Sequence, residues 1–129
     1  MTKMEPGLTG KAETTVSESN TALEIGSGSV PVFATPMLVA LMEIAAINSL
    51  ERHLPEGRTT VGIKIDITHT AATPVGMTAT ARAELVKVDG KRLVFQVSAE
   101  DEAGPIGEGW HERFIVDQEK FISRAKEKI

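Results

Sequence analysis

The segment from Met37 to Ile47 is apolar on nearly every side, and Glu43 is its only polar residue. Thr35 and Pro36 predict the start of a helix, because threonine is a good N-cap and proline fits the first helical position. The sequence LPEG at 54–57 predicts where this helix has ended. A helix without a polar face has to be covered on several sides, so we expect a buried central helix.

A membrane span is the competing interpretation of the apolar stretch 30–47. That stretch contains Pro31, Pro36 and Glu43, and a charge near the middle of a span is costly. The first residues also lack the apolar run of a signal peptide. We therefore expect a protein that does not enter the membrane and that works in the cytoplasm.

The composition of the chain argues against some classes of binding partner. The net charge of −4 comes without a concentrated basic patch, which argues against nucleic acid as a partner. The chain has no cysteine, which excludes disulfides and thiolate chemistry and is compatible with a reducing compartment.

The part of the chain from Thr59 to Val116 alternates apolar and polar residues with a period of two, as strands do. Asp89-Gly90 is a strong hairpin signal within it. The pattern predicts four long antiparallel strands. Their apolar positions are Val61, Ile63, Ile65 and Ile67; Met77, Ala79, Ala81, Ala83 and Leu85; Leu93, Phe95, Val97 and Ala99; and a last strand from Trp110 to Val116.

These elements predict an α+β fold, in which a curved antiparallel β-sheet wraps a long central helix and gives that helix its cover. This is the hot-dog arrangement, and its free strand edge favours pairing with a second copy as a homodimer. We expect one domain: residues 30–129 form the hot-dog unit, and residues 1–29 contribute an N-terminal strand and loop segment. A short terminal helix from about Asp117 would dock through apolar residues such as Phe121 and Ile122.

Glu43 and His69 are the first candidate site residues. A carboxylate on an apolar helix is costly unless it is paired, so Glu43 either pairs with a lysine or arginine or serves in a pocket as a base or as the orienter of a histidine. If the strand keeps its register from Thr59, His69 shares the parity of Val61, Ile63, Ile65 and Ile67, so it should point towards the helix, near Glu43. A lone inward histidine is more often a core residue bonded to backbone, but a His–Glu pair would make an acid/base unit.

Thr35 is the third candidate, although an N-cap needs no catalytic role. Helix N-termini offer free N–H groups and a positive dipole end, which suit an anionic oxygen. About 12 Å of helix separates Thr35 from Glu43, so the two cannot bond directly. The three histidines show no metal-ligand spacing, and the chain has no phosphate-binding glycine loop or dinucleotide fingerprint, so we expect no metal and no cofactor.

Several short motifs together resemble one known family. The most specific is ITHTAATP at 67–74. Supporting it are VFAT at 32–35, LME at 41–43, GMT at 76–78, AEL at 83–85, GKRL at 90–93, VSA at 97–99, IGEG at 106–109 and HER at 111–113. In order and spacing, over about residues 30 to 125, they resemble the fluoroacetyl-CoA thioesterase type of hot-dog enzyme.

The resemblance implies hydrolysis of a short-chain acyl-CoA thioester to a carboxylic acid and CoA. It puts the catalytic threonine, glutamate and histidine at Thr35, Glu43 and His69, and a glycine near the substrate at Gly62. Before Thr35 the fluoroacetyl-specific enzyme carries aromatic lid residues. Here residues 27–31 read SGSVP and leave Phe33 as the aromatic substrate contact, so a general short acyl-CoA is the expected substrate.

Two further points stay open from the sequence. Lys91 and Arg92 follow the predicted hairpin and could meet the CoA phosphates or simply be solvated. Thr35 could be a nucleophile or an oxyanion and orienting group, and we favour the second because an unactivated hydroxyl is a poor nucleophile. The competing functions are a hot-dog enoyl-CoA hydratase and a non-catalytic acyl-CoA-binding protein, neither of which would release CoA.

Overall fold

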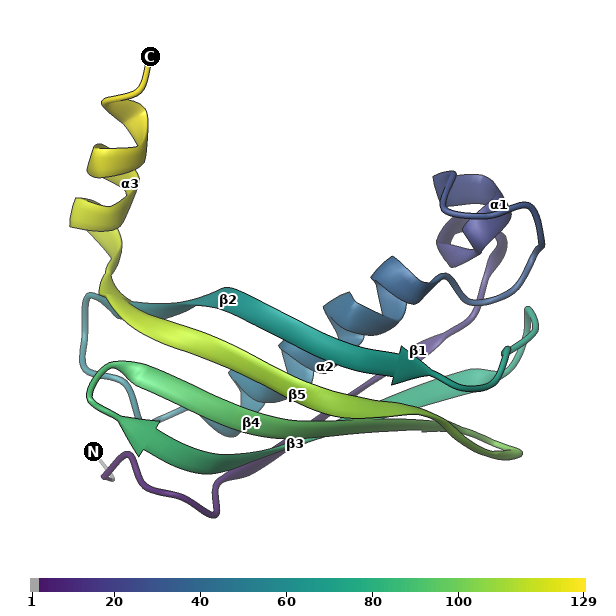
Figure 1. Cartoon of the computed structure of the whole chain (residues 1–129), viewed down its shortest axis with the longest axis horizontal. Coiled ribbons are helices and arrows are strands. Elements are labelled where there is room, and N and C mark those ends of the chain that lie inside the picture. Colours follow the sequence, from purple (N-terminus) through teal and green to yellow (C-terminus); the bar gives the residue numbers. More distant parts are fainter. Residues whose placement is uncertain (1–2) are drawn as a thin grey trace.

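The computed structural model describes residues 3–129. Figure 1 shows one sheet that curls along the central helix α2. The strands lie in the order β1-β3-β4-β5-β2, and every neighbouring pair is antiparallel. The elements in chain order are β1 (Thr9–Thr15), η1 (Glu18–Asn20), α1 (Ala22–Ile25), α2 (Thr35–Ser49), β2 (Arg58–His69), β3 (Thr78–Asp89), β4 (Arg92–Asp101), β5 (Gly104–Asp117) and α3 (Gln118–Lys126).

The helix α2 begins one residue earlier than its sequence predicts. Ala34 occupies the N-cap and Thr35 is the first helical residue, so the Thr35 hydroxyl makes no capping bond. The side of α2 that packs on the sheet is buried: Leu38, Leu41, Met42, Ala45 and Ala46. On its other side Ile44 and Ile47 are each 47% exposed. The sheet of one chain therefore covers one side of the helix, and the prediction of burial all round is wrong for the single chain.

The predicted inner faces of β3 and β4 are confirmed. The inward residues Ala79, Ala81, Ala83, Leu85, Leu93, Phe95, Val97 and Ala99 are all buried. The turn between the two strands falls at Gly90, whose φ of 62° is in the left-handed region that glycine tolerates. The helix α2 rests mainly on β1 and β3, and the inward residues of β4 extend this apolar floor.

The strand β2 breaks the regular alternation that its sequence predicts. Its register against β5 shifts between Gly62 and Lys64, so Ile63 is an extra residue in a β-bulge. Gly62 lies opposite the buried Arg113, and Ile65 lies opposite the buried His111. The inward parity therefore changes from even to odd positions across Ile63. The predicted inward direction of Val61 is therefore wrong, whereas that of His69 holds because the bulge lies before it.

The C-terminal helix α3 stands away from the sheet, beyond the start of β2 (Figure 1). It begins where the sequence predicts, at about Asp117, and the side chain of this N-cap residue accepts a hydrogen bond from the Lys120 N–H. Phe121 and Ile122 are each 46% exposed, so the predicted docking of this helix does not occur within residues 3–129. None of the helices formed by residues 3–129 has the length and apolar character needed to cross a membrane.

Candidate active site

Thr35 and His69 meet at one end of the inner face. Thr35 opens α2 and His69 closes β2, and Thr35 Oγ1 lies 2.7 Å from His69 Nδ1. The other ring nitrogen, Nε2, is buried and has no hydrogen-bond partner among residues 3–129. A buried polar nitrogen without a partner is rare, and it marks a place where a ligand, a water or another chain completes the structure.

The backbone at the start of α2 leaves one donor beside this pair. Pro36 has no N–H, and the N–H groups of Met37 and Leu38 both donate to the carbonyl of Ala34. Within the described chain, the backbone donor that this leaves free in the first turn is the N–H of Thr35. It lies at the positive end of the helix dipole, where a developing oxyanion is stabilised.

Burial lowers the pKa of His69, and a backbone interaction with Ala71 partly opposes that shift. The imidazole is therefore neutral at pH 7. When the proton of a neutral ring is on Nε2, Nδ1 is an acceptor and the Thr35 hydroxyl donates to it. This is the arrangement of a hydroxyl and its general base.

Glu43 lies two helical turns further along α2 and belongs to a different cluster. Its Oε2 accepts a hydrogen bond from Arg113 Nη1 at 3.1 Å, and its side chain is 37% exposed. The ion pair with an arginine, one of the two alternatives left open by the sequence, is therefore present. Within one chain Glu43 is not in contact with His69.

Arg113 is buried and is held from several sides. Its Nε donates to Thr60 Oγ1 at 2.9 Å, and its Nη2 donates to the carbonyl of Thr60 at 3.0 Å. Burial lowers the pKa of Arg113, and the neighbouring Glu43 carboxylate opposes that shift. The sequence pattern does not reveal this residue, because HER at 111–113 lies on a strand whose inward positions depend on the register with β2.

Another group does approach the backbone of Gly62 closely, but that group belongs to the protein. A side chain at position 62 would overlap Glu43 Oε2 and would lie 3.3 Å from Arg113 Nη1. The sequence predicted that this glycine leaves room for the acyl group. In the structure, the space is filled by the carboxylate and guanidinium of the Glu43–Arg113 pair.

The remaining predicted contacts lie elsewhere. Phe33 is 1% exposed and packs in the core beside the start of α2. Lys91 lies in the exposed β3–β4 turn, and Arg92 is paired with Asp89 and Glu112. Arg92 is seven residues along β4 from the row that contains His69, or about 23 Å. The structure does not bring Lys91 or Arg92 to the Thr35–His69 pair of the same chain.

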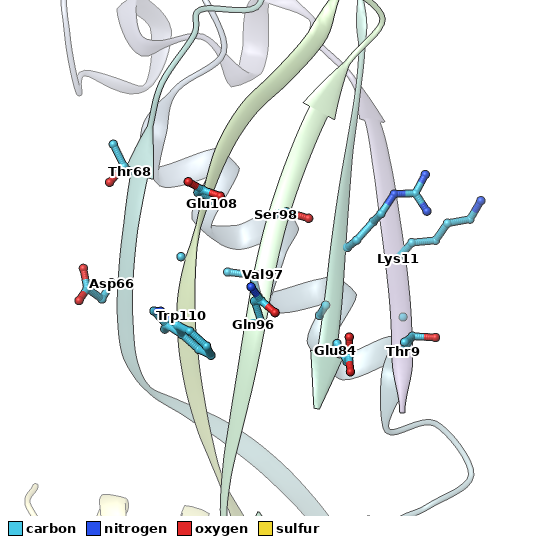
Figure 2. Close-up of a pocket in the computed structure, with 14 residues that line it drawn as sticks. Thr9, Lys11, Asp66, Thr68, Glu84, Gln96, Val97, Ser98, Glu108 and Trp110 are labelled. Carbon is cyan, nitrogen blue, oxygen red and sulfur yellow. The ribbon is translucent and has the colours of Figure 1, made fainter. Parts of the chain in front are cut away.

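A hollow of about 1000 Å³ lies on the opposite face of the sheet from α2. Figure 2 shows its central row, in which one residue from each strand points outward: Thr9, Glu84, Gln96, Trp110 and Asp66. Both Lys11 and Arg82 line the hollow, together with three acidic residues. None of Thr35, Glu43 and His69 lines it, so this hollow is not the candidate site.

Within residues 3–129 no group of three or more histidine, cysteine, aspartate or glutamate side chains could hold a metal ion. The candidate site consists of the Thr35 hydroxyl, the His69 imidazole, the Glu43 carboxylate and the Arg113 guanidinium. These groups can move protons and stabilise a developing negative charge.

Known proteins share this architecture and these motifs. The family model described as fluoroacetyl-CoA-specific thioesterase matches residues 16–119. This chain belongs to that family. The fluoroacetyl-CoA thioesterase of Streptantibioticus cattleyicolor is 45% identical to it over 97 residues, which cover 75% of this chain and 70% of that protein.

Solved structures of the fluoroacetyl-CoA thioesterase FlK are close to this member of the family. One matches with a TM-score of 0.92 at 36% identity and covers 99% of both chains. A thioesterase superfamily member from Thermus thermophilus matches with a TM-score of 0.88 at 31% identity, over 99% of this chain and 97% of that one. A hot-dog-like protein from Thermanaerovibrio acidaminovorans matches with a TM-score of 0.87 at 25% identity, over 98% and 93% of the chains. The predicted hot-dog fold is confirmed.

Proposed function

We propose that this chain hydrolyses a short-chain acyl-CoA thioester to a carboxylic acid and CoA, with Thr35, His69 and Glu43 as its catalytic residues. The observation that carries the proposal is the 2.7 Å contact between the Thr35 hydroxyl and His69 Nδ1, in a member of a thioesterase family. The contact lies at a helix N-terminus with a free backbone N–H, where a thioester carbonyl oxygen would be stabilised.

The contact with His69 changes the role that we assign to Thr35. A threonine hydroxyl is a poor nucleophile on its own, but here it lies against a neutral imidazole that can accept its proton. Thr35 Oγ1 attacks the thioester carbon while His69 takes the proton. The C–S bond then breaks, and His69 returns the proton to the departing sulfur. Water then attacks the acyl-threonine ester while His69 takes its proton; as the ester C–O bond breaks, His69 returns that proton to Thr35 Oγ1 and the acid is released.

The distance between Glu43 and the Thr35–His69 pair supports a homodimer. β2 is an edge strand whose outer side is unpaired among the described residues. If two copies of β2 pair in antiparallel fashion about a centre midway between Gly62 and His69, Gly62 of one copy lies opposite His69 of the other. Because Glu43 lies against Gly62, its carboxylate would then approach the second copy's Thr35–His69 pair.

Exposed isoleucines on α2 and on the edge strand β2 favour pairing with a second copy. Ile44 and Ile47 on α2 are each 47% exposed, and Ile63 and Ile65 on β2 are 51% and 38% exposed. Apolar side chains gathered around a free strand edge are the usual surface for a second copy. In the dimer Glu43 would orient the attacking water, while its charge is balanced by Arg113.

The acyl group is proposed to be short, and the location cytoplasmic. The loop before Thr35 contributes small residues at 27–29 where the fluoroacetyl-specific relative is expected to carry aromatic lid residues, so we propose activity on several short acyl groups. Lys91 remains a predicted contact for the CoA phosphates, because its ammonium group is exposed at a turn.

The test measures CoA release with a thiol reagent from acetyl-, fluoroacetyl-, propionyl- and butyryl-CoA, for the wild type and for His69→Ala in parallel. Release by the wild type that collapses in the variant supports the proposal, and the ranking of substrates identifies the acyl group. If neither protein releases CoA from any substrate while both bind it, the chain is an acyl-CoA-binding protein.

A further inference from the structure

A second histidine, His111, lies beneath the Glu43–Arg113 pair and has no part in the chemistry proposed above. Its side chain is 1% exposed, and its ring stacks on Phe95 with 6.0 Å between the ring centroids. Phe95 belongs to the apolar floor of the sheet, so the ring of His111 has a fixed plane. A rigid ring can fix the position of a group bonded to it.

The contacts of His111 determine which of its nitrogens carries the proton. Nδ1 lies 2.8 Å from the carbonyl oxygen of Lys64, and a carbonyl oxygen can only accept. Nδ1 therefore carries the proton. In the neutral ring Nε2 is then an acceptor, and it lies 3.2 Å from Arg113 Nη1, which can only donate.

Arg113 Nη1 thus has two acceptors for its two protons. One is His111 Nε2 and the other is Glu43 Oε2 at 3.1 Å. The two nitrogens Nε and Nη2 are held by Thr60. Because a guanidinium is planar, fixing these contacts fixes the direction in which Nη1 presents its second proton to the carboxylate. Gly62 leaves the space in which that contact forms.

We propose that His111 is a positioning residue: its Nδ1–H tautomer orients the Arg113 guanidinium, which in turn holds the Glu43 carboxylate in the direction that the reaction needs. The inference rests on the proposed role of Glu43 and deepens it. His111 touches no substrate. Its Nε2 also lies 3.9 Å from Glu43 Oε2, beyond hydrogen-bond distance, so it orients the carboxylate through Arg113, in a chain of three residues from β5 to α2.

A core histidine that merely satisfies the Lys64 carbonyl would look similar, and two substitutions separate the roles. His111→Gln can put its Oε1 near the position of Nε2 and keep an acceptor for Arg113, but it loses the donor to Lys64. His111→Asn can put its Nδ2 near the position of Nδ1 and keep the donor, but it loses the acceptor. A positioning role needs the acceptor, whereas a purely structural role needs the donor.

The kinetic test compares kcat and KM for CoA release by the wild type, His111→Gln and His111→Asn, with thermal unfolding of all three. We expect His111→Gln to stay within about threefold of the wild-type kcat, and His111→Asn to lose about 10- to 30-fold in kcat with little change in KM. If His111→Asn retains activity while His111→Gln loses it, or if activity only follows Tm, His111 is structural and the proposal is wrong.

Nitrogen-15 NMR of the unliganded protein tests the inference without any need for turnover. The His111 ring should show a protonated Nδ1 and an unprotonated Nε2, and the Arg113 Nη signals should move in His111→Asn more than in His111→Gln. Protonation at Nε2 instead, or Arg113 signals that ignore both substitutions, overturns the proposal even if the enzyme is active. If the wild type releases no CoA, the proposed function fails while the tautomer result still decides the role of His111 towards Arg113.

The pH profile gives a further readout. His111 is faced by Arg113 from its own strand, by Glu43 from α2 and by the backbone of Lys64 from β2, with Glu112 beside it on β5. A second proton on the ring would point a donor at Arg113 Nη1 and break the contact. His111→Gln has no such proton, so its kcat should fall less than that of the wild type as the pH is lowered. Identical acid limbs would contradict the proposal.

Discussion

The two ends of the inner face differ in how completely their polar groups are satisfied. At one end Thr35 and His69 are joined by one hydrogen bond, and His69 Nε2 is buried without a partner in the described chain. At the other end Arg113 is bonded to Thr60, His111 and Glu43. The first end is open to a reacting group, whereas the second is already organised.

This difference suggests a division of labour. A group that moves protons has to keep an unsatisfied position for its substrate, and it costs stability to do so. A group that orients or stabilises charge works best when its own environment is fixed before the substrate arrives. The first end fits proton transfer and the second fits positioning, so substitutions at the two ends should affect activity and stability differently.

The largest effect is expected from His69→Ala at the open end. Removing the proposed general base should lower kcat/KM for CoA release by about 10²- to 10⁴-fold. Because Nε2 has no partner in the described chain, its removal should change Tm little. Steady-state kinetics and thermal unfolding of the purified variant test both statements. A loss of less than about tenfold would remove His69 from the mechanism.

Substitutions of Thr35 test whether its hydroxyl is the nucleophile at this end. Thr35→Val removes the hydroxyl and keeps the shape, so kcat should fall by about 10²- to 10³-fold if Thr35 is the nucleophile. Thr35→Ser keeps the hydroxyl and should retain activity within about tenfold. Rapid-quench detection of an acyl-enzyme in the wild type provides the direct control. If Thr35→Val loses only a little activity, Thr35 is not a nucleophile.

At the organised end, Gly62→Ala should damage both activity and stability. The added methyl group would overlap the Glu43 carboxylate, so that carboxylate has to move away from Arg113. Overpacking of this kind costs about 1–3 kcal/mol, and we expect a loss of kcat of about tenfold. Chemical denaturation and CoA release measure the two effects. Unchanged values for both would show that the Glu43–Arg113 contact has no functional weight.

The smallest effect is a pH dependence of stability from His111. Burial lowers the pKa of His111 below its ordinary value, the Lys64 hydrogen bond opposes this, and the Arg113 charge adds to it. The unfolded chain therefore binds a proton first, and stability is lost as the pH falls below about 6.5, by at most about 1.4 kcal/mol per pH unit. Urea denaturation between pH 7 and pH 5 should show this slope, and His111→Gln should reduce it.

The sequence predicts the residues at one end of the inner face better than those at the other. The alternation in β3 and β4 predicted their buried faces, because no register shift interrupts Ala79 to Leu85 or Leu93 to Ala99. His69 was predicted to face inward from a parity shared with Val61, Ile63, Ile65 and Ile67, and the direction holds because Ile65 and Ile67 lie after the bulge. The inward direction of His69 could therefore be predicted from the sequence, but its contact with Thr35 could not.

The organised end was not visible, for two physical reasons. The bulge at Ile63 reverses the inward parity of β2, and only the preceding Gly62 hinted at it, since glycine within a strand often marks a bulge or a close approach. Whether Arg113 faces inward depends on which residue of β2 lies opposite it. That pairing is a long-range property that the local pattern does not contain. Glu43 was therefore recognised as exceptional before its partner could be named.

The central claim is that the two ends come together only between two copies of the chain. Mixing inactive His69→Ala with inactive Glu43→Ala, after unfolding and refolding together, tests it directly. If each site combines the Thr35–His69 pair of one copy with Glu43 of the other, a mixed dimer contains one intact site and one doubly altered site. Random assortment then restores CoA release to about one quarter of the wild-type rate. If the mixture stays as inactive as its parents while size-exclusion chromatography shows mixed dimers, each site lies within one chain and the account is wrong.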